Sequence, residues 1–147
     1  MTVSAEPKRE IVIAAAVLLN ERRQMLVVRK RGTTQFMQPG GKIDPGETPE
    51  QALHRELAEE IGLTLPENAV RYEGVFREEA ANETGADVVA HAFIARLYAD
   101  VTPQAEIEEV RWLDLDRHPG VMIARLTETQ MLPLARAALT ESDNQPR

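Results

Sequence analysis

The sequence has no cysteine among its 147 residues. A chain without thiols cannot form a disulfide, use a cysteine nucleophile, or hold an iron–sulfur cluster or a zinc ion through sulfur. It also lacks a long hydrophobic run, because the longest, from Ile11 to Leu19, has nine residues. Such a run is too short to span a bilayer, and no cleavage-site pattern accompanies it. We therefore expect a cytoplasmic protein that does not associate with a membrane.

Basic and aromatic side chains are both scarce. Seventeen Lys and Arg residues face twenty-four Asp and Glu residues, which gives a formal net charge of −7, and aromatic residues make up 4%. Surfaces that bind nucleic acids combine clustered basic residues with interleaved aromatic ones, so we expect no nucleic-acid partner. The apolar fraction of 43% and the charged fraction of 28% are those of an ordinary globular domain.

The ends of the chain are polar and have no periodicity. They predict a flexible leader over residues 1–9 and a flexible tail over residues 141–147, which leaves one domain at residues 10–140. Within the domain, apolar runs predict strands, and the first two of these are joined as a hairpin by a polar turn. The predicted strands cover residues 11–19, 24–31, 70–77, 88–98 and 110–115, with 70–77 paired to 88–98.

One long helix is predicted between the first two strands and the others. Thr48 and Gln51 have the spacing of a capping box, and Gly62 is a typical helix stop. A second helix is expected over residues 127–139, with Pro133 kinking it or delaying its start. Strands and helices in this order indicate the α/β (α+β) class, with helices packed on a mixed sheet.

The first helix carries three acidic residues on one face. At about 100° per residue, Glu56, Glu59 and Glu60 fall within roughly a quarter of a turn of one another, whereas Arg55 falls toward the opposite side. Neighbouring like charges destabilise a helix, and a hard divalent cation such as Mg²⁺ would relieve their repulsion. A plain solvated acidic face is the alternative interpretation of these three residues.

The three acids belong to a longer pattern. Gly41 is followed after five residues by Glu47, and after seven more by the run from Arg55 to Leu63, which reads Arg-Glu-Leu-Ala-Glu-Glu-Ile-Gly-Leu. This stretch resembles the signature box of the Nudix hydrolase family at every fixed position. The resemblance implies an α/β/α sandwich around a mixed, curved sheet. It also implies a Mg²⁺- or Mn²⁺-dependent hydrolase that cleaves the pyrophosphate bond of a nucleoside diphosphate linked to another moiety.

The resemblance also implies a metal site and a general base. Glu56, Glu59 and Glu60 would be metal-binding carboxylates, and the backbone carbonyl of Gly40 would be a further ligand. Either Glu56 or Glu59 would be the general base, and the sequence leaves that choice open.

Two further assignments come from the same resemblance. Arg55 and Glu47 would form an ion pair that orients the catalytic glutamates. Family members often use one more acid from a loop before the last core strand. Here Glu106 is the first choice for this metal ligand and Glu109 the second, the alternative being a solvated acidic loop.

Three consecutive cations, Arg29, Lys30 and Arg31, end the second predicted strand. They could bind the phosphates of the substrate, or they could be the charged residues of an edge strand that prevent aggregation. Both interpretations stay open, because alternate residues of a strand point to opposite faces.

Other activities on the same scaffold are weighed against hydrolysis. An isopentenyl diphosphate isomerase would need a cysteine, RNA decapping would need a basic surface, and a nucleotide sensor would have a degraded box. Subfamily markers for ADP-ribose and dinucleoside polyphosphate hydrolases are absent where Glu78 and Glu79 stand. A nucleoside triphosphate, including an oxidised one, is therefore the substrate expected by default, with nucleotide sugars such as ADP-ribose as the alternative. Either a monomer or a homodimer is compatible with the sequence.

Overall fold

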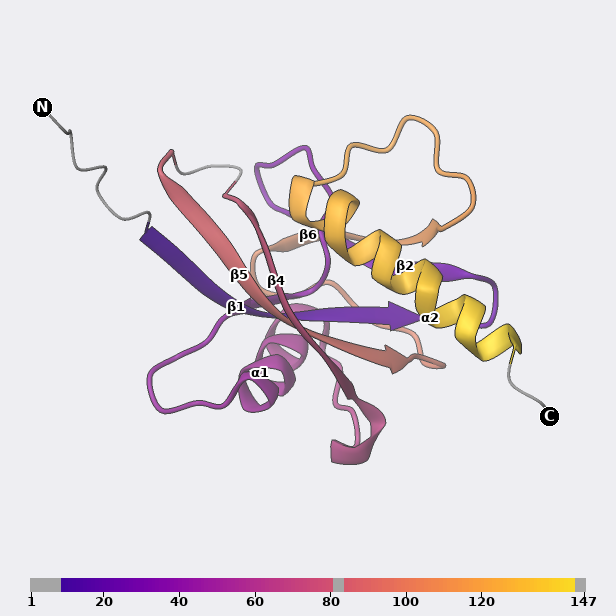
Figure 1. Cartoon of the computed structure of the whole chain (residues 1–147), viewed down its shortest axis with the longest axis horizontal. Helices are drawn as coiled ribbons and strands as arrows, with labels where there is room; N and C mark the ends of the chain where they lie inside the picture. Colours follow the sequence, from indigo (N-terminus) through magenta and orange to yellow (C-terminus); the bar gives the residue numbers. More distant parts are fainter. Residues whose placement is uncertain (1–8, 81–83, 145–147) are drawn as a thin grey trace, which may run out of the picture.

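The computed structural model describes residues 9–80 and 84–144. Its strands form one twisted mixed sheet in the order β4-β5-β1-β2-β6, and β3 pairs with β1 beside this path (Figure 1). The elements are β1 (Arg9–Leu19), β2 (Gln24–Lys30), β3 (Gly40–Lys42), α1 (Pro49–Ile61), η1 (Glu67–Ala69), β4 (Arg71–Glu79), β5 (Ala86–Arg96), β6 (Ile107–Asp114), η2 (Thr127–Met131) and α2 (Leu132–Asn144).

The central strand β1 organises the sheet. It pairs in parallel with β5 along its whole length, from Arg9 opposite Ala86 to Leu19 opposite Arg96. Its other edge is shared, because β3 pairs antiparallel with residues 13–15 and β2 meets it only where Leu19 lies opposite Met25. Strands β1 and β2 therefore diverge, and the segment that leads into β3 occupies the space between them.

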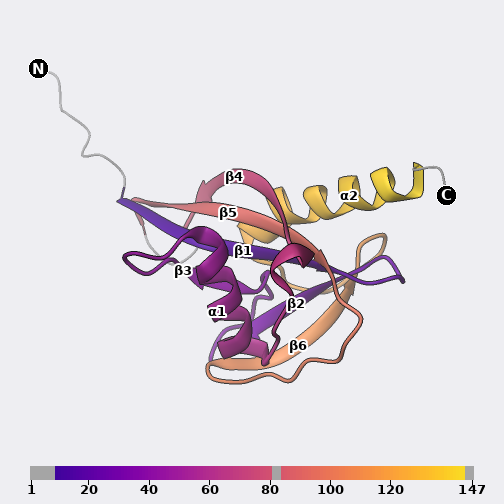
Figure 2. The same ribbon diagram turned by 90° about the horizontal axis from the view of Figure 1, so that it is seen from below.

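Two apolar cores lie on opposite faces of the sheet. Figure 2 shows α1 on one side of the strands and α2 on the other. Alternate residues of β1 supply the two cores: Val17 and Leu19 pack in the core that contains residues of α2, and Ala16 and Leu18 pack in the core that contains residues of α1. Burial on both faces explains why β1 is apolar at every position from Ala14 to Leu19, whereas Val12, nearer its start, is 39% exposed. The expected α/β/α sandwich is confirmed.

The boundaries of α1 follow from its end residues, as predicted. The backbone N–H of Gln51 donates to Thr48 Oγ1 at 3.2 Å, and the backbone N–H of Thr48 donates to Gln51 Oε1 at 2.9 Å. Gly62 ends the helix with a left-handed φ of 63°. These two ends fix where the acidic residues of the helix stand relative to the sheet.

The second helix begins irregularly. Residues 127–131 form a single π turn, in which the backbone N–H of Leu132 donates to the carbonyl of Thr127. Only Leu132 separates the turn from Pro133, which has no N–H to continue a regular ladder. The helix neither stops nor starts late at Pro133, and the irregularity expected from this residue lies in the turn before it.

Three expectations need correction. The sequence predicts that strands 11–19 and 24–31 pair along their length as a hairpin, and this is wrong. They pair only at Leu19 and Met25, while β1 pairs mainly with β5 and β2 pairs with β6. The residues Pro39, Gly40 and Gly41 are typical of a turn, but Gly40 and Gly41 instead begin strand β3. Helix α2 continues to Asn144, so it includes the first four residues assigned to the tail, and β1 begins at Arg9 rather than after it. Residues 1–8 and 145–147 of the expected leader and tail lie outside the described residues.

Candidate active site

The short strand β3 crosses helix α1 at the positions of two of its glutamates. The backbone N–H of Gly40 donates to Glu60 Oε1 at 2.8 Å. A Cβ atom at Gly41 would lie 2.5 Å from the carboxyl carbon of Glu56, and one at Gly40 would lie 2.0 Å from the carbonyl oxygen of Ala14. Only glycine permits this approach, which brings the two carboxyl groups to the place where β1 and β2 diverge.

Replacing Gly40 by Ala is expected to destabilise the fold by at least about 2 kcal/mol, because the residue has a φ of 137° and the new methyl group would meet the backbone at Ala14. Gly32→Ala is the matched control, since Gly32 also has a positive φ, of 81°, but a Cβ atom there would have no other atom within 4 Å. Urea denaturation of both variants measures the difference, and equal losses would show that the close approach costs nothing.

Arg55 is the centre of an ion-pair network between the loop after β3 and helix α1. Its Nε and Nη2 atoms donate to the two carboxylate oxygens of Glu47 at 2.7 and 2.8 Å. Its Nη1 atom donates to Glu56 Oε1 at 2.9 Å and lies 3.5 Å from Glu59 Oε2. The Nη2 atom also donates to the carbonyl of Lys42 at 3.0 Å. One guanidinium therefore ties the loop to two of the three predicted site glutamates of the helix.

The expected pairing of Arg55 with Glu47 is present and strongly perturbs the carboxyl group. The pKa of Glu47 is lowered to about 2, first because Arg55 hydrogen-bonds to it, and second because the backbone N–H of Asp44 donates to its Oε1 atom at 2.8 Å. The pKa of Arg55 is raised by the same pair. Both groups are thus charged throughout the physiological pH range.

The position of Arg55 on the helix predicts that its side chain points away from the acidic face, and this expectation is wrong. The helical angle gives only the direction of the Cα–Cβ bond, whereas the long arginine side chain extends along the surface. In the structure its guanidinium reaches Glu56 and Glu59, and it offsets part of their mutual repulsion.

Glu60 is the most buried of the acidic residues in this region, with 3% of its surface exposed. Burial raises its pKa to about 7, and the charges of Glu56 and Glu106 add to this increase. The N–H of Gly40 and the charge of Lys30 act in the opposite direction without cancelling it. When Glu60 is ionised, the site therefore contains a buried negative charge that the Gly40 N–H and Lys30 only partly stabilise.

The three consecutive cations have different surroundings. Arg29 donates from Nε to Glu109 Oε1 at 3.3 Å, and Arg31 donates from Nε to Glu108 Oε2 at 3.0 Å, so both pair with acids of β6. Lys30 instead lines a cavity beside β3. Of the three, Lys30 is the one that faces the candidate site.

Glu106 lies beside Lys30, with Oε1 3.5 Å from the lysine Nζ atom. Its charge also contributes to the raised pKa of Glu60, which places it near the glutamates of α1 although it comes from the segment before β6. Glu109, the second choice for this role, pairs with Arg29 instead.

The predicted metal ligands are only partly brought together. Among residues 9–80 and 84–144, no three acidic or histidine side chains converge as a metal-binding group. Glu59 has 55% of its side chain exposed and faces Arg55. Glu56, Glu60 and the backbone of Gly40 nevertheless offer hard oxygen donors next to a buried, uncompensated carboxyl group, and this donor chemistry suits a hard divalent cation. The ligand set itself stays a prediction.

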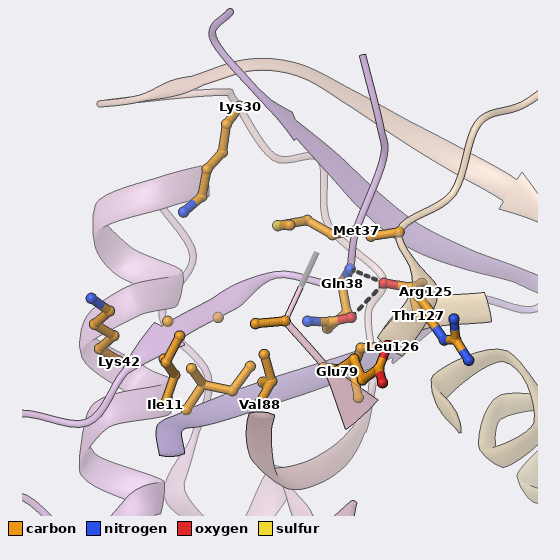
Figure 3. A pocket seen from close by; sticks show the side chains of 15 residues that line it. Ile11, Lys30, Met37, Gln38, Lys42, Glu79, Val88, Arg125, Leu126 and Thr127 are labelled. Carbon is orange, nitrogen blue, oxygen red and sulfur yellow. Dashed lines mark hydrogen bonds between the residues drawn. The ribbon is translucent and has the colours of Figure 1, made fainter. Parts of the chain in front are cut away.

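A cavity of about 240 Å³ adjoins β3 (Figure 3). The two glycines of β3 and Lys30 form one part of its lining, and apolar side chains of β1 and β5, including Ile11 and Val88, form another. Residues Ala124 to Thr127 line a further side. The cavity thus extends from the glycines that contact Glu56 and Glu60 to apolar side chains. Such a lining suits a ligand that has one charged and one apolar part.

Sequence reasoning misses two residues in this cavity, Gln38 and Thr127, which are 5% and 0% exposed. Gln38 is separated from strand β3 by Pro39 alone, and the pattern around Thr127 indicates only a helix cap. The distance of 89 positions between them hides their contact. A polar residue two positions before a glycine pair that approaches a site is the one signal in the sequence.

Comparison with known proteins agrees with this arrangement. A family model described as NUDIX domain matches residues 9–135. The chain belongs to this family. Nudix hydrolases generally need a divalent metal ion.

Several Nudix relatives are similar over part of the chain. An 8-oxo-dGTP diphosphatase from Haemophilus influenzae is 47% identical over 70 residues, which cover 45% of this chain and 51% of the relative. An RNA pyrophosphohydrolase from Mannheimia succiniciproducens is 43% identical over 56 residues, which cover 38% of this chain and 28% of the relative. The chain thus spans about half, or less, of the length of these curated relatives.

Solved structures show the same fold over more of the chain. The Nudix domain of NrtR from Shewanella oneidensis, determined with ADP ribose, matches with a TM-score of 0.72 and 22% identity over 92% of this chain and 94% of that one. A MutT Nudix hydrolase from Burkholderia pseudomallei matches with a TM-score of 0.68 and 22% identity over 87% and 96%. In the described part of this Nudix chain, the helices are too short or too polar to cross a membrane.

Proposed function

We propose that this Nudix chain is a Mg²⁺-dependent pyrophosphohydrolase that cleaves a nucleoside diphosphate linked to another moiety. The observation that supports this proposal best is the crossing of β3 and α1. There Glu56 and Glu60 meet Gly40 and Gly41, and the same glycines line the 240 Å³ cavity. Carboxylates for cation binding and a cavity for the rest of the substrate are therefore adjacent.

Each side chain has a role in the proposal. Glu56 or Glu59 accepts the proton of the attacking water, and Arg55 holds both near the loop that contains Glu47. Lys30 faces the cavity and binds a substrate phosphate there.

A divalent cation would be held by Glu56, Glu59, Glu60 and the Gly40 carbonyl, with Glu106 as a further ligand. When bound, Mg²⁺ (or Mn²⁺) neutralises phosphate charge and acidifies the attacking water. Glu60 is suited to this role because its buried negative charge lacks a full partner in the protein.

A nucleoside triphosphate is the proposed substrate class. The similarity to an 8-oxo-dGTP diphosphatase supports it, and oxidised nucleotides belong to the same class. The formal charge of −7 argues against a long nucleic acid as the substrate, in spite of the similarity to RNA pyrophosphohydrolases.

The proposal is tested by measuring phosphate or pyrophosphate release from nucleoside triphosphates, 8-oxo-dGTP, ADP-ribose and dinucleoside polyphosphates, with Mg²⁺ and with a chelator. We expect turnover of at least one nucleoside triphosphate that requires the metal. Tight nucleotide binding in calorimetry without any product would favour a sensor instead, and faster cleavage of ADP-ribose than of every triphosphate would contradict the substrate class.

A further inference from the structure

Strand β4 forms one edge of the sheet. It pairs with β5 on one side, and within the described part of the chain no strand lies on its other side (Figure 1). The backbone N–H of Ala80 donates to the carbonyl of Ala86 at the start of β5. Residues of an antiparallel strand bond alternately to its two sides, so counting back from Ala80 places the backbone groups of Glu79, Arg77 and Val75 on the open side.

Two of these three residues have backbone groups that already find a partner within the chain. The N–H of Glu79 donates to Glu78 Oε1 at 3.0 Å, and the carbonyl of Arg77 accepts a long hydrogen bond of 3.4 Å from Gln130 Nε2. Both bonds agree with the outward direction of these groups. Among the described residues no side chain caps Val75 in this way, so the open part of the edge is centred on that residue.

The side chains beside this open backbone are apolar and exposed. Tyr72 and Val75 are 50% and 49% exposed. Tyr72 pairs with Phe93, which belongs to the core that contains residues of α1, and Val75 pairs with His91, so both lie on the α1 face of the sheet. The ring of Tyr72 is held by its hydroxyl, 2.9 Å from His91 Nδ1, and by Phe93, whose ring centroid is 5.2 Å away. Open backbone groups beside a rigid apolar surface are what a further strand requires.

The charges of β4 make the strand complementary to itself. Its sequence is Arg-Tyr-Glu-Gly-Val-Phe-Arg-Glu-Glu, with Val75 in the middle. When two copies of the strand are placed antiparallel about Val75, Glu73 of each copy lies opposite Arg77 of the other. Arg71 then lies near the two glutamates that end the other strand. Opposite charges across a ladder stabilise it, so this order of charges favours pairing of β4 with a second β4.

We propose that two copies of this chain associate through β4, with the strands antiparallel and the two Val75 residues opposite each other. Such an interface is isologous, and it closes because each copy uses the same open edge. Tyr72 and Val75 of both copies come to lie on one face of the joined sheet. The occupant is a second copy because an extended segment of unrelated sequence would match the charges only by chance. The ladder is short, so we expect a dissociation constant on the order of 10 µM.

A disulfide tests the register of this pairing. The chain has no cysteine, so Val75→Cys introduces its only thiol. Opposed residues of an antiparallel ladder have Cα atoms about 4.5 to 5.5 Å apart, a separation that a disulfide spans. Under mild oxidation most of this variant should become a covalent dimer. Met122→Cys is the matched control, since Met122 is 57% exposed but lies between β6 and η2, and it should stay largely monomeric. Equal cross-linking of the two variants would overturn the proposal.

Charge reversal tests the contact of Glu73 with Arg77. In Glu73→Arg and in Arg77→Glu, like charges oppose each other at both symmetric positions, so each dissociation constant should rise at least about tenfold. An equimolar mixture of the two variants should form a mixed dimer as readily as the unmodified protein, because opposite charges then meet again. Each variant also loses an ion pair within its own chain, with Arg71 or Glu10, and mixing does not restore that pair.

Analytical ultracentrifugation over a range of concentrations measures these equilibria, and circular dichroism establishes that each variant is folded. A dimer as tight in folded Glu73→Arg as in the unmodified protein, or two single variants that stay apart when mixed, would overturn the proposal. So would an unmodified protein that is monomeric well above 10 µM, the order of magnitude expected for a short interface. The edge would in that case be open to an extended segment of a different protein. Hydrolysis plays no part in these measurements, so the proposed function is tested separately.

Discussion

Glu56→Gln is expected to lower the turnover of the cleaved nucleotide by about 10²- to 10⁴-fold, the usual contribution of a general base. The glutamine retains the volume that fills the space above Gly41, and its amide oxygen can still accept from Arg55. It cannot, however, take a proton from water or provide an anionic ligand. The loss should therefore appear in the catalytic rate with a folded protein, measured with saturating Mg²⁺ by product release and by thermal melting.

Glu50→Gln is the matched control for this experiment. Glu50 stands in the first turn of the same helix and outside the Arg55 network. The variant should keep the activity of the unmodified protein within about twofold, since surface substitutions have small effects. Activity retained by Glu56→Gln would be incompatible with the mechanism proposed here.

Without a divalent cation, the protein is expected to lose up to about 3 kcal/mol of stability through Glu60 between pH 4.5 and pH 7, because the pKa of this group rises from 4.5 to about 7 on folding. In this window the folded state binds more protons than the unfolded state, so raising the pH favours unfolding. Glu47 contributes little there, because its pKa of about 2 in the folded state and 4.5 in the unfolded state places its own pH-dependent change in stability mainly below the window.

Glu60→Gln isolates this contribution. The glutamine can still accept the hydrogen bond from the N–H of Gly40, but it does not ionise. Urea denaturation should give similar stabilities for the two proteins near pH 4.5 and a more stable variant at pH 8. Excess Mg²⁺ at pH 8 should stabilise the unmodified protein more than the variant. Stability curves that run parallel from pH 4.5 to pH 8 would contradict the burial of an uncompensated charge.

Local features of the fold could be predicted from the sequence, whereas its long-range pairings could not. The ends of α1 depend on Thr48, Gln51 and Gly62, which act on their own neighbours, and they are as predicted. The pairing of β4 with β5 is also confirmed. By contrast, a short polar turn between two apolar strands suggests a hairpin, but hydrophobic patterns carry no information on which distant strand completes a ladder.

The candidate site likewise has features that could be predicted from the sequence and features that could not. The box predicts Arg55, Glu47 and Glu56 in one network, and the structure contains it. The direction of the Arg55 side chain depends on its rotamer, which the helical angle does not specify. The partners of Arg29 and Arg31 depend on which strand lies beside β2, and strand alternation does not specify this. The contact of Gln38 with Thr127 depends on the packing of a loop against η2, and no local pattern could show it.

The parallel ladder of β1 with β5 has a consequence for synthesis of the chain. Every pair in this ladder joins residues 77 positions apart, as Arg9 with Ala86 and Leu19 with Arg96 do. A ribosome therefore releases the nine-residue apolar run of the first strand long before its main partner exists. Until then this hydrophobic segment must be shielded by transient collapse or by a chaperone, and closure of so large a loop is expected to make folding slow.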